Sequence, residues 1–170
     1  MAEFTRREVV LAAAGGVAAS VVGVGARAFS LSEEARQAMV ESPLVYISPL
    51  KSNAEESSCH GEVWYYTDGD DVLVGSKVST WKVRAVNQGL TQARVWVADY
   101  GPVWRAFGRY RSAPTFLAHV SVDDSPAAYE NMMQGHARRY PEEWGGWEER
   151  FRNEYKDGSR KILRYSPVGP

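Results

Sequence analysis

The stretch GEVWYYTDGDDVLVGS, residues 61–76, decides the fold. It begins with a run rich in aromatic and β-branched residues, Gly61 to Thr67, which is typical of a β-strand. Asp68-Gly69 follows and is among the strongest short turn signals. A second apolar run, Val72 to Ser76, then leads back. The sequence therefore predicts an antiparallel hairpin, and with it a sheet built from hairpins.

Further strands and helices are predicted on both sides of this hairpin. The other predicted strands are residues 44–47, 93–99, 115–122 and 160–165. Helices are predicted between Ser32 and Pro43, from Trp81 to Gln88, from Ser125 to Tyr140 and from Pro141 to Tyr155, and residues 105–112 are expected to form a loop or a bent strand. Six strands joined mostly by hairpins, with the helices gathered late in the chain, predict a mostly β, α+β fold with an antiparallel barrel or sheet.

The first 28 residues have the features of an export signal. Arg6 and Arg7 form a charged start, Val9 to Val24 is an apolar run without a charged residue, and Ala26-Arg27-Ala28 is a small-x-small cleavage site. The apolar run has about 16 residues, fewer than the roughly 20 that span a bilayer as a helix. An apolar helix that packs in the core, or remains as an anchor, is the alternative.

The paired arginines make the expected export route more specific. Thr5-Arg6-Arg7, followed after one residue by two hydrophobic ones, resembles the twin-arginine (Tat) signal of bacteria. The segment departs from that pattern in having Val9 where Phe is usual. The sequence thus predicts a Tat signal over residues 1–28, the Tat machinery as a partner, and an exported protein in the periplasm or another extracytoplasmic space.

Composition limits the size and the partners of the remaining chain. Residues 29–170 are expected to form one domain. The net charge of −1, without a basic block, argues against nucleic acid as a partner. The single cysteine, Cys59, excludes an intramolecular disulfide. Six Trp and nine Tyr suit apolar interfaces and sites for flat ligands.

Two polar clusters could suggest a metal, but neither has the required pattern. Residues 59–62, Cys-His-Gly-Glu, lack a second cysteine, and His119 and His136 stand alone in the sequence. Neighbouring residues of a strand point to opposite faces, so the Cys-His pair is also unsuited to catalysis. The acidic turn at residues 68–71 lacks the downstream glutamate of an EF-hand loop. The sequence therefore predicts no metal site.

The segment SKVSTWKVR, residues 76–84, could bind an anion. A strand ends there and a helix begins, and the first backbone N–H groups of a helix lack partners and attract anions. Ser79 and Thr80 can add hydroxyl donors, and the long side chains of Lys82 and Arg84 can converge on one phosphate. Basic residues are otherwise unfavourable at a helix N-terminus, and a bound phosphate would remove that conflict. A capped surface helix with solvated bases is the alternative.

The order of these segments resembles the pyridoxamine 5'-phosphate oxidase-like superfamily of flavin-binding split barrels. The resemblance rests on Glu62 to Tyr66 on one strand, the turn at residues 68–70, Val72 to Val74 on the partner strand, the helix that begins at Trp81, and Arg94 to Val97 on the next strand. Leu44 to Ser48 matches the first barrel strand. The resemblance implies an antiparallel six-stranded split β-barrel with flanking helices, and a homodimer with the cofactor between the subunits.

The resemblance also implies a cofactor and residues that hold it. FMN is the usual cofactor of the superfamily, some branches use deazaflavin F420, and a few members bind haem or nothing. The positions that match the phosphate-binding segment are Ser79, Thr80, Lys82 and Arg84, and those near the ring or ribityl chain are Trp64, Ser76 and Trp81. The late aromatic helices, with Trp144 and Trp147, would cover the partner subunit or close the pocket.

Three functions follow from this interpretation. The first is a flavin-dependent oxidoreductase with an unknown small-molecule substrate, in which the cofactor carries the chemistry, so no catalytic residue is assigned. The second is a non-catalytic barrel that carries or sequesters a flavin, F420 or haem. The third is a barrel that acts only through its dimer surface.

Overall fold

The computed structural model describes residues 31–169, so the predicted signal at residues 1–28 lies outside the described part. The strands are β1 (Val45–Pro49), β2 (Gly61–Val63), β3 (Tyr66–Asp68), β4 (Asp71–Lys77), β5 (Gln92–Val97), β6 (Thr115–Val122) and β7 (Arg160–Val168). The helices are α1 (Glu33–Glu41), α2 (Trp81–Asn87), α3 (Val103–Ala106), a 3₁₀ turn (Arg109–Ser112), α4 (Pro126–Arg139), α5 (Pro141–Trp144) and α6 (Glu148–Lys156).

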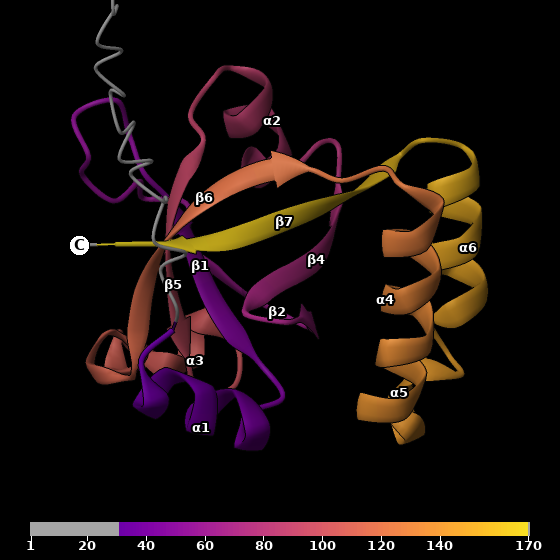
Figure 1. Ribbon diagram of the computed structural model, residues 1–170, viewed down its shortest axis with the longest axis horizontal. Helices are drawn as coiled ribbons and strands as arrows, with labels where there is room; N and C mark the ends of the chain where they lie inside the picture. The colour runs from indigo at the N-terminus through magenta and orange to yellow at the C-terminus, as the bar shows by residue number, and fades with distance from the viewer. Residues whose placement is uncertain (1–30, 170) are drawn as a thin grey trace, which may run out of the picture.

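The strands of residues 31–169 form one antiparallel sheet in the order β2-β1-β5-β6-β7-β4-β3. The two edge strands, β2 and β3, are consecutive in the chain, and only Trp64 and Tyr65 separate them. Since a residue spans at most about 3.6 Å, the two edges lie within roughly 10 Å of each other at this link. The sheet therefore curls into a barrel, as Figure 1 shows, and the predicted α+β, antiparallel architecture is confirmed.

The predicted strand at residues 61–67 is two strands, which raises the count in the described chain from six to seven. β2 pairs with β1, whereas β3 pairs with β4 at the opposite edge of the sheet. At the break between them, the backbone N–H of Tyr65 donates to the hydroxyl of Tyr140 over 3.0 Å. The Tyr140 hydroxyl thus satisfies a backbone N–H that has no strand partner at this break.

Two other segments differ from their predictions. The helix predicted from Pro141 to Tyr155 is divided into α5 and α6. Gly145 and Gly146 lie between the two, and glycine is a poor helix former. Residues 105–112 form the end of α3 and a 3₁₀ turn rather than a loop or a bent strand, with Gly108 at a φ of 77° between them. β7 extends to Val168, beyond the predicted end, because β6 pairs with it that far.

The main core fills the inside of the curled sheet. In β1 and in β4 to β7, inward-facing residues at alternate positions are buried, as the period of two requires. These are Val45, Ile47, Val72, Val74, Val95, Val97, Ala118, Val120, Leu163 and Tyr165. α1 adds Ala35 and Met39 to this cluster, α2 adds Val83, and these helices lie at opposite ends of the barrel in Figure 1.

Helices α4, α5 and α6 form a separate layer beside the barrel (Figure 1). Ala128 and Met132 of α4 pack on the outward-facing Leu73 and Ile162 of β4 and β7. α4 also lies very close to β3, since a Cβ at Gly135 would stand 2.1 Å from the ring of Tyr66. This glycine is therefore required for the helix to reach the sheet.

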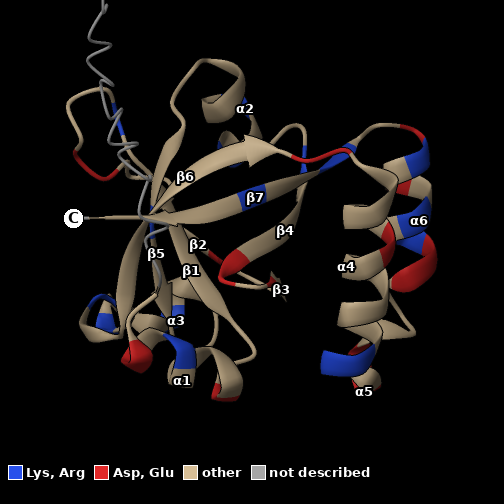
Figure 2. Cartoon of the chain, viewed as in Figure 1, with Lys and Arg blue, Asp and Glu red and all other residues tan. Residues whose placement is uncertain are grey.

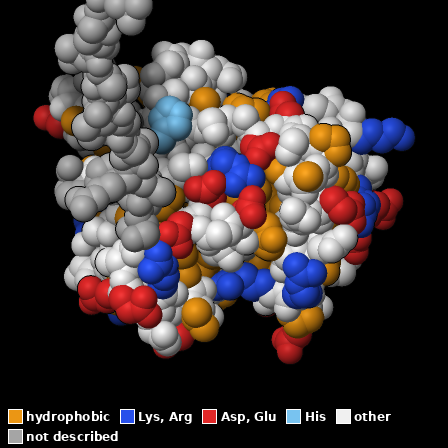
Figure 3. Space-filling model, in the orientation of Figure 1, with side chains coloured by type: hydrophobic (Ala, Val, Ile, Leu, Met, Phe, Trp, Pro, Cys, Tyr) orange, Lys and Arg blue, Asp and Glu red, His pale blue; other side chains and the backbone are white. Residues whose placement is uncertain are grey.

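The outer surface carries charges of both signs. α6 carries both basic and acidic residues (Figure 2), and Arg150 and Arg152 pair with glutamates four residues away. On the face in Figure 3, basic and acidic side chains are interspersed, with hydrophobic side chains between them. Within residues 31–169, no helix is both long and apolar enough to span a bilayer, and no three potential ligands gather as a metal site would need.

Candidate functional site

The predicted anion-binding segment lies at the junction of β4 and α2. Thr80 is the N-cap residue of α2, but its hydroxyl donates to the carbonyl of Lys77 over 2.8 Å. In the described chain, therefore, this side chain does not accept a hydrogen bond from the first turn of α2. Ser79 is exposed, whereas Ser76 is buried at the end of β4.

The two cations of this segment have different neighbours. Lys82 is half-buried, and its Nζ lies 3.6 Å from the position that a Cβ on Gly61 of β2 would occupy. Arg84 is exposed and places its guanidinium 5.6 Å from the ring centre of Trp81. The two side chains therefore lie against different parts of the structure, Lys82 beside β2 and Arg84 on the ring of Trp81.

Lys82 is a cation held in partly desolvated surroundings. Burial lowers the pKa of its ammonium group, while Cys59 and Glu62 act in the opposite direction. Glu62 is itself engaged, since its Oε2 accepts from the backbone N–H of Val103 over 2.8 Å. Among residues 31–169, the ammonium forms neither a hydrogen bond nor an ion pair. It is thus available to an anionic ligand beside β2.

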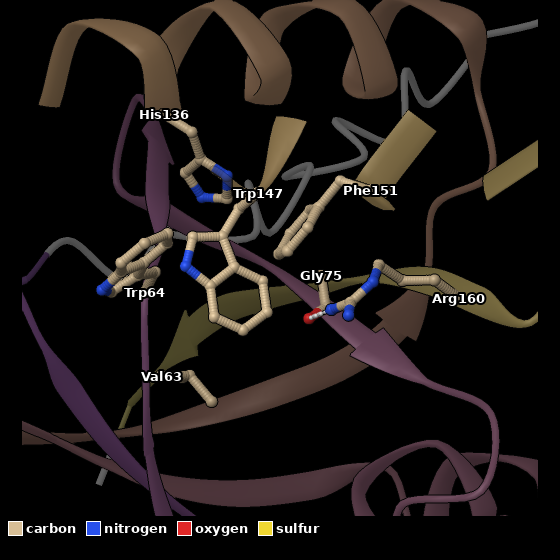
Figure 4. A pocket seen from close by; sticks show the side chains of 7 residues that line it. All are labelled: Val63, Trp64, Gly75, His136, Trp147, Phe151 and Arg160. Carbon is tan, nitrogen blue, oxygen red and sulfur yellow. Dashed lines mark hydrogen bonds between the residues drawn. The ribbon is translucent and has the colours of Figure 1, made fainter. Parts of the chain in front are cut away.

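Trp64, the remaining predicted site residue, lines a cavity of about 230 Å³ between the barrel and the helical layer. The walls come from β2 and its link to β3, from β4 and β7, and from α4 and α6 with the turn before it, as Figure 4 shows. The lining residues are Val63, Trp64, Gly75, His136, Trp147, Phe151 and Arg160. Of the two late tryptophans, Trp147 borders this cavity, whereas Trp144 is buried in the helical cluster.

Aromatic rings hold the cavity in shape. Trp64 stacks on Tyr140 with ring centres 4.6 Å apart and planes 12° apart. Trp147 meets Trp64 edge-on at 6.2 Å and Phe151 at 6.4 Å. Trp147 keeps 40% of its surface exposed, so it forms the rim, while Phe151 is buried. Stacked and edge-to-face contacts between aromatic rings stabilise the fold by more than the burial of their surface alone.

His136 is the polar group at the inner wall of the cavity. It is 1% exposed, and Figure 4 shows its ring pointing from α4 toward Trp64 and Trp147. Neither ring nitrogen has a hydrogen-bond partner in the described part of the chain. Burial, and next the charges of Arg160 and Arg139, lower the pKa of His136 to about 4. The imidazole is therefore neutral at pH 7, with one donor and one acceptor unused.

Arg160, at the opposite wall, is already paired. Its Nε donates to Glu154 over 2.7 Å and its Nη1 to the carbonyl of Gly75 over 2.8 Å. The guanidinium also lies 3.9 Å from the ring centre of Phe151. Burial pushes the pKa of Glu154 upward, but hydrogen bonds from Arg150 and Arg160 and from Lys77 outweigh it and lower the pKa to about 2. The carboxylate thus neutralises the arginine beside the cavity.

Comparison with known proteins identifies the fold. No protein-family model matches the sequence, and no curated protein matches it. HutZ, the haem storage protein of Vibrio cholerae, is 12% identical, with 84% of this chain and 93% of HutZ covered and a TM-score of 0.55. The conserved hypothetical protein Rv2991 of Mycobacterium tuberculosis is 14% identical, with coverages of 84% and 85% and a TM-score of 0.55.

A haem-binding protein of Mycobacterium smegmatis is also similar, at 11% identity and a TM-score of 0.52 over 79% of this chain and 50% of that one. This chain shares with these neighbours a curled antiparallel sheet flanked by helices, which is the fold of a split barrel. The chain is a split barrel. At these identities the likeness concerns the fold alone.

Of the residues that line this cavity, Trp64 and Trp147 were singled out from the sequence and the others were missed. Trp64 was predicted as a ring neighbour, while His136, Phe151 and Arg160 had no sequence motif to mark them. Gly135, inside a helical pattern and next to His136, was the available signal, since an interior helix glycine often has a packing reason. The lining residues lie up to 97 positions apart, between Val63 and Arg160, so only folding brings them together.

Proposed function

We propose that this split barrel binds FMN as a homodimer and uses it to oxidise or reduce a small molecule. One observation carries the proposal. The unpaired ammonium of Lys82 lies beside Gly61 of β2, and the aromatic cavity begins at Val63, two residues along the same strand and face. These two positions are about 7 Å apart. A cation next to aromatic walls suits a ligand with a phosphate at one end and a flat ring at the other.

The residues present fit FMN in part. Lys82 would hold the phosphate, with Ser79, Thr80 and Arg84 near it and Ser76 and Trp81 along the same segment. Trp64 would contact the ring system. The cavity of about 230 Å³ lies below the roughly 300–1,000 Å³ typical of ligand pockets. One chain thus encloses only part of a flavin, and the second subunit would supply the remaining wall. The bound flavin supplies the hydride or electron transfer, while the protein binds and orients it.

The absorbance spectrum of the purified full chain tests this proposal directly. A flavin spectrum, with FMN released on denaturation and identified by mass spectrometry, is the expected result. Reduction of the bound flavin by a nicotinamide donor would support the oxidoreductase. A protein that stays colourless after incubation with FMN, F420 and haem would contradict cofactor binding.

A non-catalytic carrier of flavin, F420 or haem is the second candidate. The observation in its favour is that proteins of this fold include a haem storage protein and a haem-binding protein. The same spectrum separates the candidates. A haem spectrum, or a bound flavin that nicotinamide donors leave oxidised, would favour the carrier over the oxidoreductase.

Export by the Tat route is part of the proposal and rests on the first 28 residues alone. Arg6 and Arg7 are the discriminating pair, because lysine keeps the charge and removes the twin-arginine pattern. We expect Arg6→Lys with Arg7→Lys to retain the protein in the cytoplasm on cell fractionation. Normal export of this variant would refute the Tat assignment.

A further inference from the structure

A second cavity, the α1 pocket, lies between α1, β3 with its turn to β4, and the C-terminal end of α4. Its volume of about 340 Å³ falls within the range of roughly 300–1,000 Å³ that is typical of ligand pockets. It is lined by Leu31, Arg36, Met39, Val40, Thr67, Gly69, Asp70 and Arg139. None of these residues lines the aromatic cavity or belongs to the segment at residues 76–84, so the α1 pocket is separate from the proposed flavin site.

Arg139 brings to this pocket a positive charge that no carboxylate among residues 31–169 neutralises. Its Nη2 donates to the carbonyls of Met39 and Ser42 at the end of α1 and to the hydroxyl of Tyr65. Its Nε is buried, whereas its Nη1 is accessible and has no hydrogen-bond partner in this part of the chain. The Nη1 group can therefore donate to a ligand in the α1 pocket without breaking an existing bond.

The other two charged residues of the lining neutralise each other. Nε and Nη2 of Arg36 donate to the two carboxylate oxygens of Asp70 over 3.1 and 2.8 Å. Asp70 also accepts from the backbone N–H of Leu31. The lining thus keeps one uncompensated positive charge, that of Arg139. A ligand with a single negative charge would balance it, while a dianion would leave an excess charge in a partly apolar space.

A second donor and an apolar wall narrow the choice of ligand further. The hydroxyl of Thr67 is accessible and, within the described residues, forms no hydrogen bond. Leu31 and Met39, which are nearly buried, and Val40, which is 75% exposed, supply the apolar wall. A hydrocarbon chain placed against these side chains would leave water, and this favours binding.

We propose that the α1 pocket binds a monocarboxylate with a short apolar chain. One carboxylate oxygen accepts from Nη1 of Arg139 and the other from the hydroxyl of Thr67, while the chain packs against Val40 and its apolar neighbours. Hydrogen bonds between a guanidinium and a carboxylate are short and strong. The proposal does not depend on the proposed flavin, since the two sites share no residue.

Titration of the purified full chain with hexanoate and with hexanamide at pH 7, followed by ligand-observed NMR, tests the proposal. The two probes have the same chain and nearly the same head-group shape, and they differ in charge. Wild-type protein should bind hexanoate at least about tenfold more tightly, because its bond to the arginine is charge-assisted on both sides. Equal binding of the two probes, or no binding of either, would overturn the proposal.

Three variants locate the bound carboxylate. Arg139→Gln removes the charge and should abolish the preference for hexanoate. Thr67→Val keeps the shape of the side chain and removes the hydroxyl, so it should weaken hexanoate by roughly fivefold. Val40→Asp adds a negative charge at an exposed position of the pocket wall and should weaken hexanoate by about tenfold or more. The last two variants keep the test decisive even if loss of Arg139 from the end of α1 unfolds the protein.

Two matched controls lie outside the pocket. Gln37→Asp adds the same charge to the same helix, and Thr91→Val removes a hydroxyl elsewhere; neither residue lines the α1 pocket. Both should bind hexanoate within about twofold of wild type at about 0.15 M salt, where exposed charges are screened. The proposal is overturned if Thr67→Val binds hexanoate like Thr91→Val, or if Val40→Asp binds it like Gln37→Asp.

Discussion

At the scale of single residues, His136 combines deep burial with unsatisfied nitrogens. Its pKa of about 4 in the folded protein lies below its ordinary value of 6.5. The unfolded chain therefore takes up a proton at a higher pH than the folded chain does. The free energy of unfolding is unaffected above pH 6.5 and falls as the pH drops from 6.5 toward 4.

We expect this titration to cost about 3 kcal/mol of stability between pH 6.5 and pH 4, from the shift of the pKa of His136 to about 4. His136→Phe should remove this pH dependence, and it should be at least as stable as wild type at pH 7, because no unpaired nitrogen remains buried. Urea unfolding at a series of pH values measures both effects.

His119→Phe is the matched control, because His119 is an exposed residue of β6. It should keep the wild-type pH dependence in this window. Glu154 has a pKa of about 2 in the folded protein against 4.5 in the unfolded chain, so its stabilising contribution is lost as the pH falls from about 4.5 toward 2, and this loss begins at the acid end of the window in wild type and in both variants alike. If wild type and His136→Phe lose stability equally between pH 6.5 and 4, the buried histidine is not the source.

At the scale of elements, the two cations of α2 differ in exposure, since Lys82 is half-buried and Arg84 is exposed. This difference predicts which substitution weakens binding of the FMN phosphate more. Each charge-assisted contact contributes roughly 1.5–3 kcal/mol when well made, which corresponds to about ten- to a hundredfold in affinity. Lys82→Ala should therefore weaken FMN by at least tenfold and riboflavin, which lacks the phosphate, much less. Arg84→Ala should have the same preference with a smaller effect, because Arg84 lies exposed on Trp81.

Quenching of flavin fluorescence by each apo-protein measures these affinities. Lys156→Ala, at an exposed position of α6, is the control and should bind FMN like wild type. Equal losses for FMN and riboflavin would mean that the residues act through folding. If both variants bind FMN and riboflavin like wild type, the segment does not bind phosphate and is a surface helix with solvated basic side chains.

The link between β2 and β3 depends on Tyr140 at the end of α4. Its hydroxyl accepts from the N–H of Tyr65 over 3.0 Å and lies 2.9 Å from the carbonyl of Pro43. Tyr140→Phe would leave a buried N–H without a partner, so we expect a loss of about 1–3 kcal/mol in the free energy of unfolding. Tyr129→Phe, which loses a longer contact to Arg152, should cost much less in the same denaturation experiment.

At the scale of the whole molecule, α3 and the residue after it expose large apolar side chains. Trp104 is 67% exposed and Phe107 is 87% exposed. Two such large aromatic side chains lie within four residues of the chain and face solvent. We expect the proposed homodimer to bury this pair, because aromatic residues are enriched at interfaces.

Sedimentation of the full chain at micromolar concentration should give twice the mass of one chain. Trp104→Ser combined with Phe107→Ser should weaken the dimer by tenfold or more. Val40→Ser, at a 75% exposed position of α1, removes a similar kind of surface elsewhere and should not. A wild-type monomer with its cofactor fully bound would contradict the dimer, and a double variant that dimerises normally would place the interface elsewhere.

The sequence by itself determined the features that depend on near neighbours. The turn at Asp68-Gly69, the caps at Ser32 and Ser125, and the end of α2 at Gly89 all lie where the sequence predicts them. Each depends on the backbone preferences or the hydrogen bonds of residues within one turn. The alternation of apolar residues along 115–122 likewise agrees with the burial of Ala118 and Val120 on one face of β6.

Only the tertiary structure decided where the chain changes partner and what surrounds the cavity. The break at Tyr65 depends on a hydroxyl 75 residues away, and the cavity joins residues from β2, β4 and β7 to α4 and α6. No local preference of Tyr65 or His136 encodes these contacts. They exist because the sheet must curl to bring β2 and β3 together, and because Gly135 allows α4 to lie against the sheet at that place.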